Sequence, residues 1–154
     1  MVIRDVPARV AGLSEARVAG GDRQTQETVT AYLCAKPCAD AIDFYRRAFG
    51  AEEVGERYVE PDGRIGHATM RIGGTTLYIS DEYAPLKVFS PATLGGSPVS
   101  LSLSAPDADA VFARAVDAGA RVDRPLRDEP YGRSGWLLDP FGYRWNVVAP
   151  SSRA

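Results

Sequence analysis

The chain contains the same strand-and-helix pattern twice, and this repeat limits the possible folds more than any other feature. Residues 39–51 place apolar side chains at helical spacing, with acidic residues in the first turns and basic residues in the last turns. Gly50 follows the last apolar residue, where a chain often leaves a helix. Residues 107–118 repeat the pattern and end at Gly119, 69 positions further on. The chain is therefore expected to consist of two similar units.

Alternating segments around both helices complete the two units. Period-2 alternation bounded by Gly, Pro and Asp turn signals predicts strands on either side of each helix. Their ranges are 29–35, 52–59, 65–72 and 75–80 in the first unit, and 98–105, 121–126, 136–138 and 143–148 in the second. A loop is expected over 128–135, and a turn at Asp139-Pro-Phe-Gly142. The sequence thus predicts a mixed α+β fold of two tandem βαβββ modules.

The module boundaries follow from the same pattern. Module one is expected over 28–81 and module two over 98–149, with an irregular but apolar crossover over 82–97. Residues 1–27 are weakly patterned and are expected to form an N-terminal arm, either mobile or laid on a partner subunit, and residues 150–154 a tail.

Composition excludes several classes of function. The 154 residues are 45% hydrophobic and 25% charged, as in an ordinary globular domain. A net charge of −2 gives no basic surface for nucleic acid. No apolar run is long enough to span a membrane, and the N-terminus lacks the apolar core of a secretory signal. Two cysteines are too few for a disulfide framework. We expect a cytoplasmic protein with no nucleic-acid or membrane partner.

Short motifs in both units resemble those of the vicinal-oxygen-chelate superfamily of glyoxalases, bleomycin-resistance proteins and extradiol dioxygenases, and especially its PhnB-like branch. The motifs are Ala41-Ile-Asp-Phe-Tyr45, Ala48-Phe-Gly-Ala51, Gly66-His67, Leu77-Tyr-Ile-Ser-Asp81, Ser90-Pro-Ala-Thr-Leu-Gly-Gly96, Tyr131-Gly-Arg-Ser-Gly135 and Asp139-Pro-Phe-Gly142 with Trp145. The resemblance implies that the strands curl into one open cup with the helices on its convex side, and that the chain forms a homodimer. It does not specify a function, because this scaffold hosts many chemistries.

The resemblance also implies a divalent metal held by side chains from the first and fourth strands of each module. Relative to the helix-and-glycine landmarks, these positions fall on Thr30, Tyr78, Ser100 and Asn146. None is a histidine, a carboxylate or a cysteine, the side chains that displace water from such an ion. We therefore expect neither a metal nor another cofactor.

Three other features allow both a chemical and a structural interpretation. His67, the only histidine, is either a general base or hydrogen-bond donor in the cup, or a structural residue. Cys34 and Cys38 have neither a zinc-site nor a redox spacing and are expected to be semi-buried, although a thiol near a helix N-terminus can have a lowered pKa. Asp81 and Glu82 are either paired acid–base groups or a solvated turn, and the turn is expected.

The alternation predicts which side chains line the cup. If Thr30 and Ser100 face it, so do Tyr32 and Ser102, and Arg144 accompanies Asn146. The intervening residues, among them Leu33, Leu77, Leu101 and Trp145, would then form the core. Trp136 fits either face. The predicted ligand-binding residues are Thr30, Tyr32, His67, Tyr78, Ser100, Ser102, Trp136, Arg144 and Asn146.

Such a cup suits a neutral or weakly anionic, partly aromatic ligand, with Arg144 and Arg71 best placed to meet an acidic group. The preferred interpretation is a metal-free small-molecule binder, similar to the sequestration proteins of bleomycin-resistance type. The alternative is a lyase, isomerase or dioxygenase of the same superfamily with an atypical or metal-free site. A scaffold protein with a vestigial cup is a third possibility.

Overall fold

The computed structural model describes residues 27–151, so the arm predicted over 1–27 and most of the predicted tail lie outside the described residues. The elements of the first unit are β1 (Tyr32–Cys34), α1 (Cys38–Phe49), β2 (Glu52–Glu53), β3 (Tyr58–Val59), β4 (Ile65–Ile72) and β5 (Thr75–Ser80). The crossover holds a 3₁₀ turn, η1 (Ala84–Leu86), and the short helix α2 (Pro91–Leu94). The second unit comprises β6 (Ser100–Ser104), α3 (Ala108–Ala118), β7 (Arg121–Glu129), β8 (Gly132–Leu138) and β9 (Arg144–Pro150).

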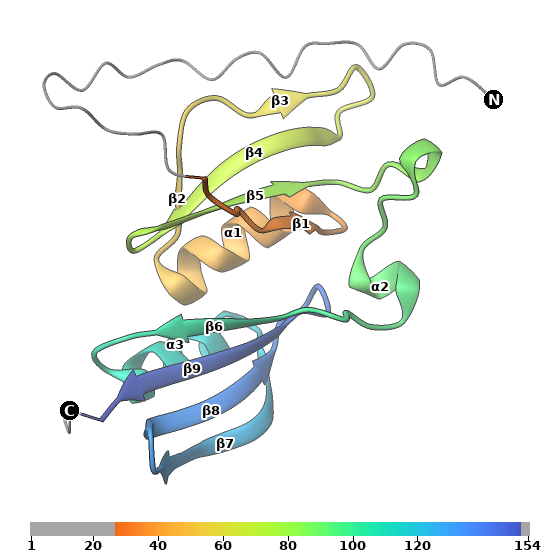
Figure 1. Ribbon diagram of the computed structural model, residues 1–154. Helices are drawn as coiled ribbons and strands as arrows, with labels where there is room; N and C mark the ends of the chain where they lie inside the picture. Colours follow the sequence, from red (N-terminus) through yellow and green to blue (C-terminus); the bar gives the residue numbers. More distant parts are fainter. Residues whose placement is uncertain (1–26, 152–154) are drawn as a thin grey trace, which may run out of the picture.

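Each unit forms its own sheet, and the two sheets have matching strand orders. The first sheet runs β1-β5-β4-β2, with β3 also paired to β4, and the second runs β6-β9-β8-β7. In both sheets the first strand pairs in parallel with the last, and the remaining pairs are antiparallel. Figure 1 shows α1 and α3 each packed against one face of their sheet, which leaves the other face open. The predicted α+β fold of two βαβββ modules is confirmed.

The helix-facing sides of both sheets share one hydrophobic core. The apolar stripe of α1 is fully buried, and Leu33, Leu77 and Trp145 are buried as the alternation predicted. α1 and α3 pack on each other, and Arg114 Nε on α3 donates to the carbonyl of Ala48 at 2.9 Å. None of the described helices is long and apolar enough to cross a membrane.

A buried polar seam joins the two modules at the turn between β8 and β9. The carboxylate of Asp139 accepts hydrogen bonds from the Tyr45 hydroxyl of α1 at 2.7 Å and from the Trp145 indole at 3.0 Å. It also accepts the backbone N–H groups of Phe141 and Tyr143, both at 2.9 Å. We call Tyr45, Asp139, Tyr143 and Trp145 the module seam. The predicted turn therefore also locks module two onto the helix of module one.

Tyr143 extends the module seam to the edge of β1. Its hydroxyl accepts the N–H of Cys34 and donates to the carbonyl of the same residue, both at 3.0 Å. One side chain thus supplies the two hydrogen bonds that a neighbouring strand would otherwise make.

Asp81 and Glu82 are structural acceptors, so the solvated turn expected for them is wrong. Asp81 accepts the N–H groups of Cys38 at 2.8 Å and Ile65 at 2.7 Å, which ties the start of α1 to β4. Glu82 accepts the N–H and hydroxyl of Ser90 at 2.9 and 2.7 Å, and also bonds Thr93 and, at 3.0 Å, Lys36. These donors lower the pKa of Glu82 to about 2. The pair therefore anchors the crossover.

Two segments depart from the secondary structure predicted for them. The strand expected over 52–59 is divided into β2 and β3, with Gly55 at φ +73° between them. The loop expected over 128–135 is mostly strand, because β7 and β8 form a long hairpin. Gly132 permits this hairpin: a Cβ there would lie 2.2 Å from the carbonyl oxygen of Ala149. Gly132 is therefore required by the close approach of β8 and β9 and does not mark a loop.

Candidate functional site

Three ring side chains form a cluster on the open face of module one. Tyr32 on β1 and Tyr78 on β5 are cross-strand partners, and His67 lies on β4. Ring centroids are separated by 5.5 Å for Tyr32–His67, 5.5 Å for Tyr32–Tyr78 and 5.0 Å for His67–Tyr78. We call these residues the aromatic cluster. The structure thus brings together three predicted ligand-binding residues from three strands.

Both ring nitrogens of His67 have hydrogen-bond partners. Nδ1 lies 2.8 Å from the Tyr32 hydroxyl, and Nε2 lies 3.2 Å from the hydroxyl of Thr69, which the sequence analysis did not select. Burial lowers the pKa of His67 below its ordinary value, so the imidazole is neutral at pH 7. A neutral imidazole has one acceptor nitrogen, and in either tautomer a hydroxyl occupies it. His67 is therefore not poised as a free base.

The open face of module one carries little net charge. Burial raises the pKa of Tyr32, so its phenol is also neutral at pH 7, although the residue remains 54% exposed. Arg71, which the sequence analysis noted as a possible partner for an anion, is paired with Glu52. Exposed phenol and imidazole edges without free charge suit a partly aromatic ligand.

The Gly66-His67 motif has a packing role. A Cβ at Gly66 would lie 2.8 Å from Tyr58 Cδ1, so the glycine leaves room for this ring beside the aromatic cluster.

Thr30, another predicted ligand-binding residue, lies two positions before β1, outside the strand.

The remaining predicted residues share the open face of module two. Ser100 is opposite Arg144, Ser102 is opposite Asn146, and Trp136 is also opposite Asn146. The guanidinium of Arg144 lies over the Trp136 ring, 4.6 Å from its centroid, and contacts Asp123 at 2.6 Å. The alternation did not determine whether Trp136 faces the core or the cup; in the structure it lies on the open face.

Three further arginines lie on this face, and the sequence analysis missed them. Arg121, Arg124 and Arg127 are opposite Leu138, Trp136 and Ser134 of β8, which alternate without interruption on the open face. The register of β7 shifts twice, between Val122 and Arg124 and between Arg124 and Arg127. Each bulge adds one residue, so side chains on the same face are separated by three positions there and not by two. The three arginines, which are three positions apart, therefore lie on one face.

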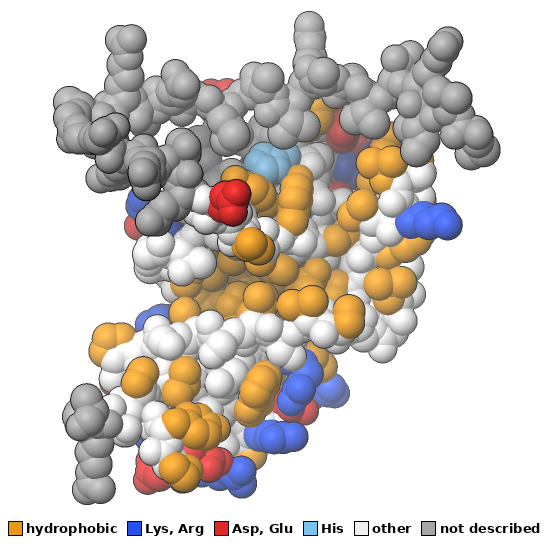
Figure 2. All heavy atoms as spheres, viewed as in Figure 1, with side chains coloured by type: hydrophobic (Ala, Val, Ile, Leu, Met, Phe, Trp, Pro, Cys, Tyr) orange, Lys and Arg blue, Asp and Glu red, His pale blue; other side chains and the backbone are white. Residues whose placement is uncertain are grey.

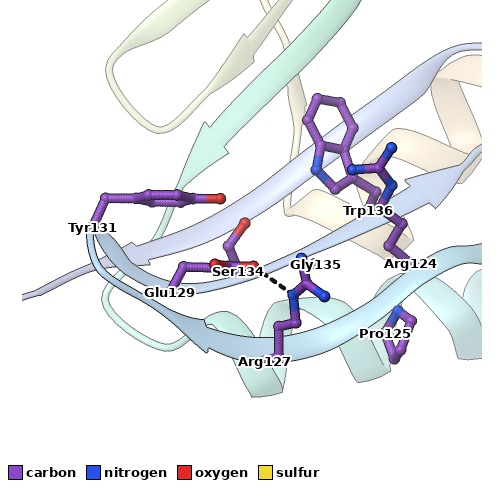
Figure 3. A pocket seen from close by; sticks show the side chains of 8 residues that line it. All are labelled: Arg124, Pro125, Arg127, Glu129, Tyr131, Ser134, Gly135 and Trp136. Atoms are coloured by element: carbon purple, nitrogen blue, oxygen red, sulfur yellow. Dashed lines mark hydrogen bonds and ion pairs between the residues drawn. The ribbon is translucent and has the colours of Figure 1, made fainter.

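A small cavity lies among these side chains. It has a volume of about 40 Å³ and is lined by Arg124, Pro125, Arg127, Glu129, Tyr131, Ser134, Gly135 and Trp136. Figure 3 shows Arg124 and Trp136 pointing to the same side of the sheet, and Arg127 pairing with Glu129.

The residues that the motif resemblance places at the superfamily's metal-ligand positions do not fit a metal ion. Thr30, Tyr78, Ser100 and Asn146 offer neutral hydroxyl and amide groups in place of imidazole, thiolate or carboxylate ligands. Within residues 27–151, no three or more His, Cys, Asp or Glu side chains are grouped so as to hold a metal ion.

The two cysteines are buried, and their thiols have raised pKa values. Burial raises the pKa of Cys34 to about 11 and that of Cys38 to about 12, and the nearby carboxylates Glu82 and Asp81 add to the shifts. The possibility of a lowered pKa at the helix N-terminus is therefore excluded for Cys38, the first residue of α1.

Relatives and solved structures match most of the chain. An uncharacterized protein of Mycobacterium tuberculosis is 40% identical over 129 residues, covering 81% of this chain and 75% of the relative. The X-ray structure of an Arabidopsis thaliana gene product has 30% identity and a TM-score of 0.64, covering 80% of this chain and 98% of that one. The crystal structure of TioX from a Micromonospora species has 25% identity and a TM-score of 0.61, covering 83% and 99%.

More distant structures share the fold alone. A PhnB protein from Bacillus cereus, described as a putative methyltransferase, has 24% identity and a TM-score of 0.59, covering 80% of this chain and 99% of its own.

The sequence profile of the Glyoxalase/Bleomycin resistance protein/Dioxygenase superfamily matches residues 27–147. The resemblance inferred from the short motifs is thus confirmed, and the chain belongs to this superfamily.

Proposed function

We propose that the protein binds a partly aromatic small molecule and holds it without chemical change, as sequestration proteins of bleomycin-resistance type do. The aromatic cluster carries this proposal. It combines exposed ring edges with hydroxyl groups, its histidine is neutral, and both nitrogens of that histidine are already hydrogen-bonded. Such a surface can stack on and hydrogen-bond a ligand, but it offers no free acid or base.

Binding would be completed by a second copy of the chain. The cavity of about 40 Å³ on module two is far smaller than the roughly 300–1,000 Å³ of typical small-molecule sites. The crossover, at the right of the view in Figure 1, exposes Leu86, Val88 and Leu94. Figure 2 shows further hydrophobic side chains across the middle of the same view. We expect a homodimer that buries the exposed crossover side chains and encloses the open faces. Light scattering of untagged protein tests the dimer, and a monomer at micromolar concentration would contradict it.

A ligand screen tests the binding function. Untagged protein, purified without chelators, is heated with and without members of an aromatic natural-product library. A ligand at 100 times its Kd should stabilise the fold by about 2.7 kcal/mol, visible as a higher Tm. Tyr32→Leu should weaken binding of the best hit several-fold, while Val116→Ala, at an exposed position of α3 outside the crossover and the open faces, should not. Equal effects of the two variants would remove the aromatic cluster from the site.

Recovery of the ligand separates binding from catalysis. After incubation and denaturation, mass spectrometry should return the ligand unchanged. A converted product would instead support the alternative of a lyase, isomerase or dioxygenase, which requires His67 to release a hydroxyl partner. Elemental analysis of the same preparation provides a second check, because about one metal ion per chain would contradict a metal-free site. The cytoplasmic location remains a prediction.

A further inference from the structure

The open face of module two concentrates positive charge in a chain that is acidic overall. Arg121, Arg124, Arg127 and Arg144 lie on it, against the acidic residues Asp123 and Glu129. The whole chain, in contrast, has a net charge of −2. An excess of guanidinium groups on one sheet face favours anionic ligands.

The arginines on this face differ in whether they have partners. Arg144 is held by Asp123 and lies over the ring of Trp136. Arg127 is paired with Glu129. Arg124 makes no ion pair with any residue between 27 and 151, although it sits directly opposite Trp136 across the β7–β8 ladder. Its planar fork of donors matches the two oxygens of a carboxylate.

The cavity beside Arg124 has the size and lining of a carboxylate subsite. Its volume of about 40 Å³ admits a group of a few atoms but not a whole drug-sized ligand. The hydroxyl groups of Ser134 and Tyr131 lie on its wall (Figure 3). Ser134 Oγ donates to Asn146 Oδ1 at 2.7 Å. The half-buried indole of Trp136 forms the adjoining wall, where a ring attached to the carboxylate can pack.

We propose that Arg124 and Trp136 form an anion subsite that selects aromatic carboxylates over neutral molecules of the same shape. This inference rests on the proposed function, because it assigns a ligand class to the site that a second copy of the chain would complete. It adds a charge requirement that the aromatic cluster of module one does not impose.

Calorimetric titration of the full chain with 2-naphthoate and 2-naphthamide tests the subsite, since the two probes share a ring system and differ in charge. The wild type should bind naphthoate about tenfold or more tightly than naphthamide, as expected for a charge-assisted bidentate pair. Arg124→Gln should abolish this preference without changing naphthamide binding. Arg121→Gln, which removes the same charge from the same strand opposite Leu138, should leave it nearly intact. Added NaCl should weaken binding of naphthoate alone.

Each outcome decides the inference. Equal binding of the two probes, or a preference that survives Arg124→Gln, overturns the anion subsite and leaves the binding function in place. An equal loss in both arginine variants shows a general field effect and also overturns the assignment to Arg124. If neither probe binds at millimolar concentration, the subsite is wrong, and the library screen decides separately whether the chain binds small molecules. Unfolding curves of both variants establish that they are folded.

Discussion

Polar side chains in the module seam are buried and fully paired, whereas those on the open faces are partly exposed and only some of them are paired. In the module seam every polar atom has a partner within the chain: Asp139 is 4% exposed and accepts four hydrogen bonds. On the open faces, Tyr32 is half-exposed, and Arg124 has no ionic partner among the described residues. Polar groups of the first kind hold the fold together, whereas those of the second kind are available to a ligand.

The comparison shows that a polar residue's role depends on whether its partners lie inside the chain. Asp81 and Glu82 are acidic groups whose sequence allowed acid–base chemistry or a solvated turn, yet each has donors within the chain. Substitutions in the module seam should therefore lower stability, while substitutions on the open faces should change binding with little effect on stability. The predictions below test this division.

Asp139→Asn should have the largest effect. All four groups that face the carboxylate are donors, so the amide N–H₂ of asparagine would meet donors and leave buried groups unpaired. We expect the free energy of unfolding to fall by about 3 kcal/mol, measured by urea denaturation. Asp107→Asn is the matched control, because Asp107 caps α3 and asparagine caps helices equally well. Equal losses in the two variants would contradict the role assigned to the module seam.

Tyr143→Phe should be the next most damaging change. Without the hydroxyl, the N–H and the carbonyl of Cys34 both lose their partner at the edge of β1. Leaving two buried backbone groups unpaired should cost about 2 kcal/mol in the same assay. Tyr131→Phe, at a position that is 57% exposed, should cost almost nothing. If Tyr143→Phe is as stable as wild type, another strand or solvent must satisfy the edge of β1.

Glu82→Gln should destabilise the crossover in a pH-dependent way. The folded-state pKa of Glu82 is lowered to about 2, below that of the unfolded chain, so its contribution is fully present above about pH 4.5 and disappears as the pH falls towards 2. Because the site is near solvent, we expect a loss of about 1 kcal/mol at pH 7. The difference from wild type should shrink below pH 4.5 in thermal unfolding. A constant difference across this range would show that charge is not involved. The exposed Glu56, replaced by Gln, is the control.

The sequence was sufficient to predict the fold and the direction of most side chains. The repeat marked by Gly50 and Gly119 gave the two modules, and alternation placed Tyr32 and Tyr78 on one face and Leu33 and Leu77 on the other. These predictions succeed because one face of each strand must be buried, which fixes the register of uninterrupted strands.

The arginines on the open face of module two and the module seam depend on bulges and long-range contacts, which alternation does not predict. Two bulges in β7 bring Arg124 and Arg127 onto the open face, and no residue type in that stretch marks where the register shifts. Asp139 begins a turn that any sequence reading would place on the surface, yet Tyr45, 94 residues away in the chain, reaches it. Such long-range partners appear only when the two modules are packed together.

Tyr32→Phe should have the smallest effect on stability, and it tests the hydrogen bond between Tyr32 and His67 in the aromatic cluster. A phenol is a more acidic donor than an aliphatic hydroxyl, so Tyr32 should donate to Nδ1 of His67 and leave the proton on Nε2, facing Thr69. Removing a donor to the neutral imidazole should raise the pKa of His67 towards its ordinary value. NMR titration of the imidazole measures this shift, and Tyr58→Phe, at an exposed ring nearby, is the control. No shift in Tyr32→Phe would mean that burial alone lowers the pKa of His67 and that Tyr32 does not donate to Nδ1.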